Sequence, residues 1–323
     1  MKDSIQSIIF FGTDLFATHI LSALLFHGKK VVAVVTKGDK AKERGGKVLP
    51  PPVKKFLLEH YPNIPLFQPE KASTPEFASI LRSFTPDLFV VVSYGEIISE
   101  ALLAIPKQLP INIHPSFLPK YRGASPLRSA ILEGDKEIGV AIIEMVKKMD
   151  AGDILKMGKL KISEKENHSD IEKKMFIKAE ALLLECLEEC EQNCVSKMPQ
   201  KGEVTFTKKV TKGDEWIDWT QSVDTILNHI RAFGDVPGAI TEVELEGKRI
   251  LIKILRGEKY SSDGVAYPQT VGFSKKEGWL VGCKDGVIRI CRVQPESKKS
   301  MDVQDFINGA RNKTPIVIVQ GRV

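Results

Sequence analysis

The sequence predicts an open, doubly wound α/β domain with a mostly parallel sheet, followed by a small antiparallel β-barrel. In the first half, short runs of valine, isoleucine and leucine alternate with helical patterns, which is typical of parallel strands covered on both faces. After about Lys209, short strand-like segments alternate with turn residues, as in small antiparallel barrels. The length of 323 residues fits two domains, since one domain has roughly 100–200 residues.

The elements of the first half follow one another in a regular order. Strands are predicted at β-branched and apolar runs, and helices where apolar residues recur at helical spacing. The predicted strands are residues 8–11, 31–36, 87–93, 111–114 and 139–145, and the predicted helices are residues 15–26, 52–60, 77–83 and 126–132. Together they predict one sheet with helices on both faces.

A long helix is predicted over residues 169–194, and Cys186, Cys190 and Cys194 fall one turn apart on it. Histidines are lacking nearby and the spacing fits no common zinc pattern, so we interpret these thiols as small apolar side chains rather than as a metal site. Residues 195–208 are polar and contain Pro199 and Gly202, which is typical of a linker. We therefore expect domains over residues 1–194 and 209–323.

The second half predicts one helix and then a series of short strands. The helix covers residues 222–233, and the strands cover residues 239–245, 249–256, 271–273, 278–283 and 287–293. Turn residues separate the strands, as in the segment Lys284-Asp285-Gly286. From residue 201 onward, 20 Lys and Arg stand against 16 Asp and Glu, so this half carries most of the net charge of +6.

Composition narrows the class of protein. Hydrophobic residues make up 42% and charged residues 27% of the chain, which is ordinary for globular proteins. No apolar run approaches the ~20 residues of a membrane helix, and residues 1–11 are too short and too acidic for a targeting segment. The five cysteines form no disulfide framework, so a cytoplasmic protein is expected. The mild positive charge permits an anionic partner without requiring one.

The turn Phe11-Gly12-Thr13-Asp14 is the first candidate site, because ligands bind beyond the carboxyl ends of the strands in an open parallel sheet. A dinucleotide fingerprint would place three glycines here, and only Gly12 is present, so a nicotinamide oxidoreductase is not favoured. A helix that begins after Thr13 would still leave backbone N–H groups pointing into the cleft.

Asn112 and His114 form the second candidate. They lie on the same face of a predicted strand that Pro115 ends. An amide donor beside an imidazole suits acyl transfer, because the amide can stabilise an oxyanion while the imidazole moves a proton. A structural role for the pair is the alternative, and Pro115 and Pro119 indicate a rigid loop such as the rim of a pocket.

Asp150, in the segment Met149-Asp150-Ala151-Gly152-Asp153, is the third candidate. An acid before a glycine is commonly a turn former, which is the alternative explanation. A carboxylate near His114 would orient the imidazole and raise its pKa.

The ordered set of segments resembles the folate-dependent formyltransferases, and the methionyl-tRNA formyltransferases in particular. The resemblance runs nearly from end to end. Its segments are Phe11-Gly12-Thr13, Val90-Val91-Val92-Ser93-Tyr94-Gly95, Asn112-Ile113-His114-Pro115-Ser116-Phe117-Leu118-Pro119, Arg122-Gly123-Ala124-Ser125-Pro126, Gly139-Val140, Asp150-Ala151-Gly152-Asp153, Ile217-Asp218-Trp219, Arg231-Ala232-Phe233 and Gln294-Pro295. It implies a Rossmann-like formyltransferase domain followed by an OB-like domain.

The resemblance implies that Asn112, His114 and Asp150 form the catalytic trio. An amine attacks the formyl carbon of the co-substrate 10-formyltetrahydrofolate, the Asn112 amide and a protonated His114 hold the resulting oxyanion, and Asp150 organises the imidazole and a water. The residues implied to line the folate site are Tyr94, Gly95, Glu96, Ile97, Ser116, Phe117, Leu118 and Pro119. Neither a metal nor a nicotinamide is implied.

The loop over residues 37–47 carries five basic residues and is, by itself, most simply a solvated loop. It resembles the insertion by which the family grips the acceptor end of initiator tRNA, and Arg44 falls on the family's key arginine. Lys47, Lys208 and Lys209 are expected to contact phosphates. The expected partners are initiator methionyl-tRNA and a folate, with no membrane, and the chain is expected to be a monomer.

Two other functions compete with this prediction. A formyltransferase acting on an amino-sugar nucleotide would keep the trio, but it would need neither the Arg44 loop nor the full second domain. A folate- or RNA-binding protein without catalysis would not require the trio. The chain also departs from the family pattern: Asp14 replaces the usual proline, Ala141 replaces a common threonine, and Gly234-Asp235 replaces Asn-Pro.

Overall fold

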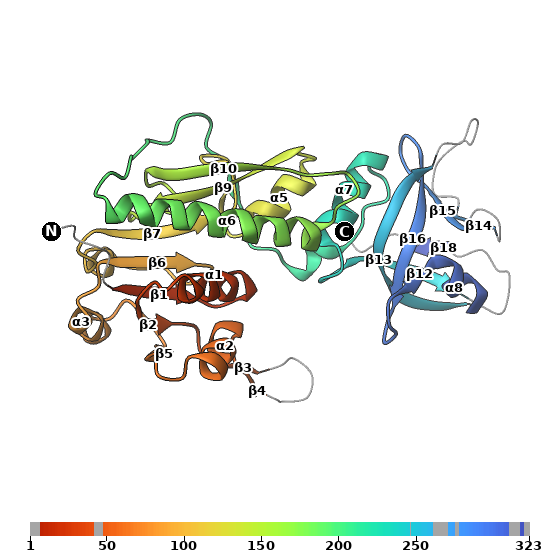
Figure 1. Ribbon diagram of the computed structural model, residues 1–323. Coiled ribbons are helices and arrows are strands. Elements are labelled where there is room, and N and C mark those ends of the chain that lie inside the picture. Colours follow the sequence, from red (N-terminus) through yellow and green to blue (C-terminus); the bar gives the residue numbers. More distant parts are fainter. Residues whose placement is uncertain are drawn as a thin grey trace. The chain divides into compact units, whose positions relative to one another are not determined.

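The computed structural model describes residues 7–41, 48–245, 247–260, 271–274, 278–309 and 317–319, with residues 40–41, 271–274 and 317–319 described by their backbone alone (Figure 1). Two compact units make up the fold. The first contains the described residues of Met1–Gly123, Ile138–Leu160 and Lys173–Phe206, and the second contains those of Ala124–Glu137, Lys161–Glu172 and Thr207–Val323. Within the described residues, no helix is long and apolar enough to cross a membrane.

A seven-stranded sheet forms the centre of the first unit, with the strand order β10-β9-β7-β6-β1-β2-β5. Its strands are β1 (Ile8–Gly12), β2 (Val31–Val35), β5 (Leu66–Phe67), β6 (Leu88–Val92), β7 (Leu109–His114), β9 (Glu137–Glu144) and β10 (Ile154–Lys161). Strand β1 pairs in parallel with both β2 and β6, β6 pairs in parallel with β7, and β7 pairs antiparallel with β9. The chain therefore reverses its direction of travel across the sheet between β1 and β6, which is where ligands bind in such folds.

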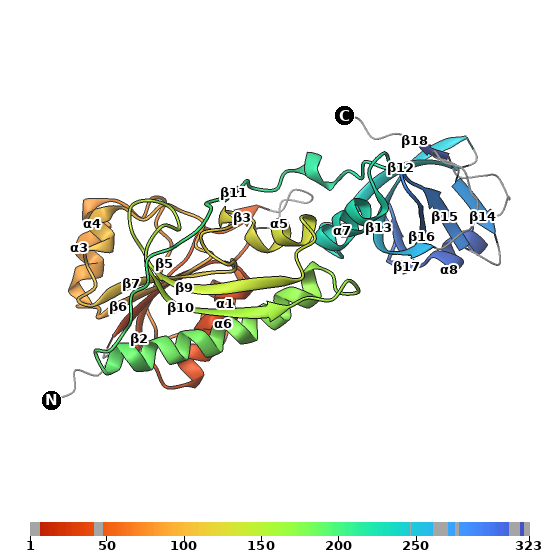
Figure 2. The same cartoon turned by 90° about the horizontal axis from the view of Figure 1, so that it is seen from above.

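Helices cover both faces of this sheet (Figure 2). On one face, α3 (Pro75–Ser83) and α4 (Glu100–Leu103) pack against alternate residues of β1 and β6, including Phe11 and Phe89. On the other face lie α1 (Leu15–Phe26) and α6 (His168–Glu191). These two helices are in contact through the stacked rings of Phe16 and Phe176, whose centroids are 4.9 Å apart. The smaller elements are α2 (Pro52–His60), β3 (Lys40–Ala41) and β4 (Val48–Leu49).

The second unit contains an antiparallel sheet with the order β14-β15-β16-β13-β12-β18, and β17 pairs with β16. Its elements are α5 (Pro126–Leu132), η1 (Lys212–Glu215), α7 (Val223–Phe233), β12 (Ala239–Leu245), β13 (Lys248–Tyr260), β14 (Val271–Ser274), β15 (Gly278–Gly282), β16 (Val287–Pro295), β17 (Met301–Asp302), α8 (Val303–Gly309) and β18 (Val317–Val319). The sheet curls into a half-barrel (Figure 1), and the ring of the fully buried Trp279 stacks on that of Phe306 with centroids 6.2 Å apart. The predicted fold class, a parallel-rich α/β sheet followed by an OB-like sheet, is confirmed.

The segment that reads as a linker in the sequence is hydrogen-bonded along the first unit. Met198 forms a bridge with Ile154 of β10, and β11 (Phe206–Thr207) pairs with β8 (Arg122–Gly123). Thr205 accepts a hydrogen bond from the Arg122 N–H through its carbonyl, at 2.9 Å. The polar composition, with Pro199 and Gly202, therefore marks an irregular backbone that is hydrogen-bonded to the first unit. The limits of the two domains, residues 1–194 and 209–323, remain a prediction.

Candidate functional site

The segments that follow β1, β6 and β7 leave the sheet at its carboxyl edge, where these parallel strands end side by side. After β1, the hydroxyl of Thr13 donates to the carbonyl of Tyr94 at 3.1 Å, which ties this turn to the segment that follows β6. A Cβ at Gly12 would lie 2.5 Å from the Cβ of Ala17, so this position tolerates only glycine. The Asp14 carboxylate caps α1 by accepting from the Ala17 N–H at 3.0 Å.

Asn112 and His114 occupy the last part of β7. Asn112 pairs with Ile143 and His114 pairs with Ala141 across the antiparallel ladder, so all four side chains share one face of the sheet. The position where the chain departs from the family pattern, Ala141, therefore lies directly opposite His114. Asn112 is half-buried, whereas His114 is only 4% exposed.

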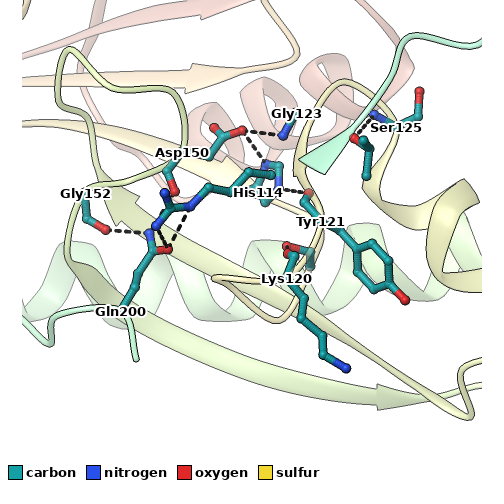
Figure 3. Close-up of polar contacts among 11 residues, drawn as sticks. His114, Lys120, Tyr121, Gly123, Ser125, Asp150, Gly152 and Gln200 are labelled. Carbon is teal, nitrogen blue, oxygen red and sulfur yellow. Dashed lines mark hydrogen bonds and ion pairs between the residues drawn. The ribbon is translucent and has the colours of Figure 1, made fainter. Parts of the chain in front are cut away.

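Both ring nitrogens of His114 face oxygen atoms of the protein (Figure 3). Nε2 lies 2.9 Å from the Tyr121 carbonyl oxygen, so Nε2 carries the proton, because a carbonyl can only accept. Nδ1 lies 3.7 Å from Oδ2 of Asp150. Burial lowers the pKa of His114, while the Asp150 carboxylate and the Tyr121 carbonyl counteract part of that change. The resting imidazole is therefore neutral at neutral pH, and the protonated form implied by the resemblance has to arise during the reaction.

Asp150 is held at the tip of the turn between β9 and β10. Its φ of 50° lies in the left-handed region, which few residues other than glycine adopt. Its Oδ2 accepts a hydrogen bond from the backbone N–H of Gly123 at 2.8 Å. A Cβ at Gly152 would lie 1.8 Å from the carbonyl oxygen of Glu144, so the turn closes only because residue 152 is glycine.

The segment after β7, expected to line the folate site, is a compact loop. Ser116 is 2% exposed, and its hydroxyl donates to the Lys120 carbonyl at 2.7 Å. Leu118 is 4% exposed and packs with Ala141, and Pro119 is also buried. The half-buried Phe117 is therefore the most accessible of the four expected side chains.

The segment after β6 contains the other residues expected to line the folate site, residues 94–97, and they differ in their exposure to solvent. Tyr94 is 2% exposed and meets the ring of Phe11 edge-on at 5.5 Å. The Glu96 carboxylate accepts from Lys37 Nζ at 2.8 Å and from the Ala72 N–H at 3.0 Å. Gly95 is exposed with φ 78°, and Ile97 is 85% exposed, so their backbone and the Ile97 side chain face solvent.

The expected tRNA contacts fall into two groups. Arg44 and Lys47 lie outside the described residues. Lys208 and Lys209 are exposed and follow β11 directly. The start of the loop over residues 37–47 is fixed, because Lys54 Nζ binds the Asp39 carboxylate at 2.8 Å and the Gln68 amide donates to the Lys37 carbonyl at 2.8 Å.

Three residues that the sequence analysis did not select complete the site: Tyr121, Arg122 and Gln200. The Tyr121 carbonyl binds His114, and Gln200 binds Arg122 at 2.6 Å and the Asp150 carbonyl at 2.8 Å. Backbone carbonyls and a distant amide leave no local pattern in the sequence, although Arg122 falls within a segment of the resemblance. Within the described part of the chain, no group of three His, Cys, Asp or Glu side chains could hold a metal ion.

Comparisons with known proteins show the family of the chain. The model of the formyl transferase family matches residues 6–187, and the model of the formyl transferase C-terminal domain matches residues 209–311. A methionyl-tRNA formyltransferase of Protochlamydia amoebophila is 38% identical over 96% of this chain and 96% of its own length. The chain belongs to the methionyl-tRNA formyltransferase family. Both halves of that family's architecture are therefore present.

Solved structures share the fold at lower identity. HypX from Aquifex aeolicus, in complex with tetrahydrofolic acid, gives a TM-score of 0.64 at 18% identity over 96% of this chain and 48% of that chain. An N-formyltransferase from Helicobacter canadensis, in complex with folinic acid and dTDP-3-aminofucose, gives 0.64 at 20% identity over 88% and 99%. At these identities the two structures show that the fold is shared, and they do not identify the acceptor of this chain.

Proposed function

We propose that the chain transfers the formyl group of 10-formyltetrahydrofolate to the α-amino group of initiator methionyl-tRNA, with Asn112, His114 and Asp150 as the catalytic residues. The observation that carries this assignment is the placement of His114. At the carboxyl edge of the sheet, its ring lies between the Tyr121 carbonyl at 2.9 Å and the Asp150 carboxylate at 3.7 Å. Asn112 shares its face of the sheet.

Because the imidazole of His114 is neutral at rest, it can accept the proton that the amine loses during the reaction. The amine attacks the formyl carbon, a new C–N bond forms, and the formyl oxygen becomes an oxyanion that the Asn112 amide stabilises. The proton that the amine loses passes to the His114–Asp150 pair, where the carboxylate stabilises the imidazolium. The bond from the formyl carbon to N10 of the folate then breaks, and N10 takes that proton. Atoms and charge balance without a metal.

The tRNA would contact basic side chains on both parts of the chain. Lys208 and Lys209 are exposed just after β11, where they are available to phosphates. Arg44 and Lys47 remain predictions from the resemblance. The relatives that match both domains at nearly full length act on methionyl-tRNA by name, which favours this acceptor over an amino-sugar nucleotide.

The test is a formylation assay with purified protein, 10-formyltetrahydrofolate and charged initiator methionyl-tRNA. We expect N-formylmethionyl-tRNA to form, and His114→Ala to abolish turnover while folate binding persists. His60→Ala, on the exposed end of α2, is the matched control and should behave as wild type. A folded His114→Ala protein with a near-normal rate would remove His114 from the mechanism. Folate binding without tRNA formylation would point to the amino-sugar nucleotide as acceptor.

A further inference from the structure

Gln200 occupies a defined place between two parts of the site. Its Oε1 accepts from Nη2 of Arg122 at 2.6 Å and from Nε at 3.2 Å. Its Nε2 donates to the Asp150 carbonyl and to the Gly152 carbonyl, each at 2.8 Å. The orientation of the amide is thus fixed on both sides, because a guanidinium can only donate and carbonyls can only accept.

Gln200 connects the turn of Asp150 to the segment that binds the His114 ring (Figure 3). Tyr121, Arg122 and Gly123 are consecutive: the first binds the His114 ring, the second binds Gln200, and the third binds the Asp150 carboxylate. Gln200 therefore closes a ring of contacts that runs from His114 to Asp150 and back.

The Asp150 turn needs such support. A left-handed conformation at a residue other than glycine costs on the order of 1–3 kcal/mol and persists only where surrounding contacts enforce it. The backbone contact of Gly123 holds the side chain of Asp150, whereas Gln200 holds its main chain on both sides of Ala151. Without the Gln200 amide, two carbonyls of the turn would lose this donor.

We propose that Gln200 is a positioning residue for formyl transfer, whose amide fixes the Asp150 turn so that the carboxylate remains beside His114. This inference rests on the proposed catalytic roles of His114 and Asp150. Gln200 is half-buried and acts through Arg122 and the turn, at a distance from the reacting atoms.

Gln200→Met keeps the length of the side chain and removes both the acceptor and the donor. A misplacement of about 1 Å in a catalytic group costs about 10²-fold in rate, so we expect kcat to fall by about 10- to 100-fold with KM values nearly unchanged. Because the Asp150 carboxylate raises the pKa of His114, its displacement should lower that pKa further. The rising limb of kcat/KM against pH should therefore move to lower pH, which a purely structural defect would not cause.

The experiment compares wild type, Gln200→Met, Asp150→Asn and the double variant, with Gln192→Met as the matched control. Gln192 is exposed and its side-chain oxygen accepts from the Cys194 thiol at 3.9 Å, far in sequence from the Asp150 turn, so its variant should behave as wild type. We expect Gln200→Met to change kcat by less than about twofold in the Asp150→Asn background, since the two act as a unit. Thermal unfolding checks that each variant is folded.

The outcomes separate this inference from the proposed function. If Asp150→Asn keeps the wild-type rate, the catalytic role of Asp150 fails and the inference falls with it. If Asp150→Asn is impaired while folded Gln200→Met keeps the wild-type kcat and pH profile, only the role of Gln200 is overturned. A full additional loss in the double variant would also overturn it.

Discussion

Replacing Gly152 by alanine tests whether the geometry of the Asp150 turn controls the rate. A Cβ at this position would lie 1.8 Å from the carbonyl oxygen of Glu144 and 2.8 Å from its carbonyl carbon. The same Glu144 donates its N–H to the Asp153 carbonyl at 2.9 Å, so the two sides of the turn are fixed to each other. The obstacle is backbone on both sides, and no side chain can rotate away from it.

The size of the effect follows from these distances. To reach even 3.0 Å, the shortest separation that Cβ atoms normally accept, the two backbones must part from 1.8 Å. That is a displacement of about 1 Å, which costs about 10²-fold in rate when it reaches a catalytic group. Forcing an extra carbon into a packed site costs about 1–3 kcal/mol of folding free energy. We therefore expect a folded Gly152→Ala protein with a strongly reduced kcat.

The assay measures kcat and KM for formyl transfer together with urea unfolding. Gly309→Ala is the matched control and should leave both measurements unchanged, because among the described residues no atom outside its chain neighbours and its own helix backbone lies within 4 Å of its Cβ position. Wild-type kcat and stability in Gly152→Ala would contradict this prediction, since the turn would then accommodate a Cβ beside the Glu144 carbonyl without moving. A loss of stability alone, with a normal kcat, would show that the position of Asp150 does not limit the rate.

Two further predictions concern single side chains. Burial and the nearby Arg128 lower the pKa of His168 to about 4. Between pH 6.5 and about 4 the unfolded chain therefore binds more protons than the folded one, so the free energy of unfolding decreases by about 3 kcal/mol as the pH falls through this range. His168→Gln should remove that loss, measured by urea unfolding at both pH limits with tryptophan fluorescence, and an unchanged pH dependence would contradict the argument. Glu96→Gln should raise KM for 10-formyltetrahydrofolate about fivefold at nearly constant kcat, because it removes an ion pair with Lys37 worth about 1 kcal/mol that fixes the segment after β6. Glu59→Gln, which alters the exposed Lys55 pair, is its control and should leave KM unchanged, whereas an unchanged KM in Glu96→Gln would remove this segment from folate binding.

The elements whose sequence pattern is continuous were predictable. The buried strands β1, β2 and β6 consist almost entirely of valine, isoleucine, leucine and phenylalanine, and the structure buries them on both faces. Helices α1 and α2 begin and end within a residue of their predicted limits. These elements follow from local sequence, because the apolar residues that form the pattern are the same residues that the folded sheet buries.

Strand β10 was not predicted, and its sequence shows why. The exposed positions of β10 are Met157, Lys159 and Lys161, and lysines are common on the last strand of a sheet. Its neighbour β9 supplies the hydrogen-bond partners, which no pattern within the segment reveals. Helices α4 and α8 were also not predicted, and the four residues of α4 carry too little periodicity to form a pattern.

The same reasoning explains which parts of the site stayed hidden. Asn112, His114 and Asp150 stood out because their chemistry suits acyl transfer, but nothing in the sequence indicates that the Tyr121 carbonyl fixes the His114 tautomer. Gln200 lies in a polar segment that reads as a linker, 50 residues from the carbonyl that it binds. A rate that depends on Gln200 would mean that this segment belongs to the catalytic machinery. The contacts of Met198 with Ile154 and of Thr205 with Arg122 would then be needed for the reaction, and a change in the length of the segment between them should lower kcat.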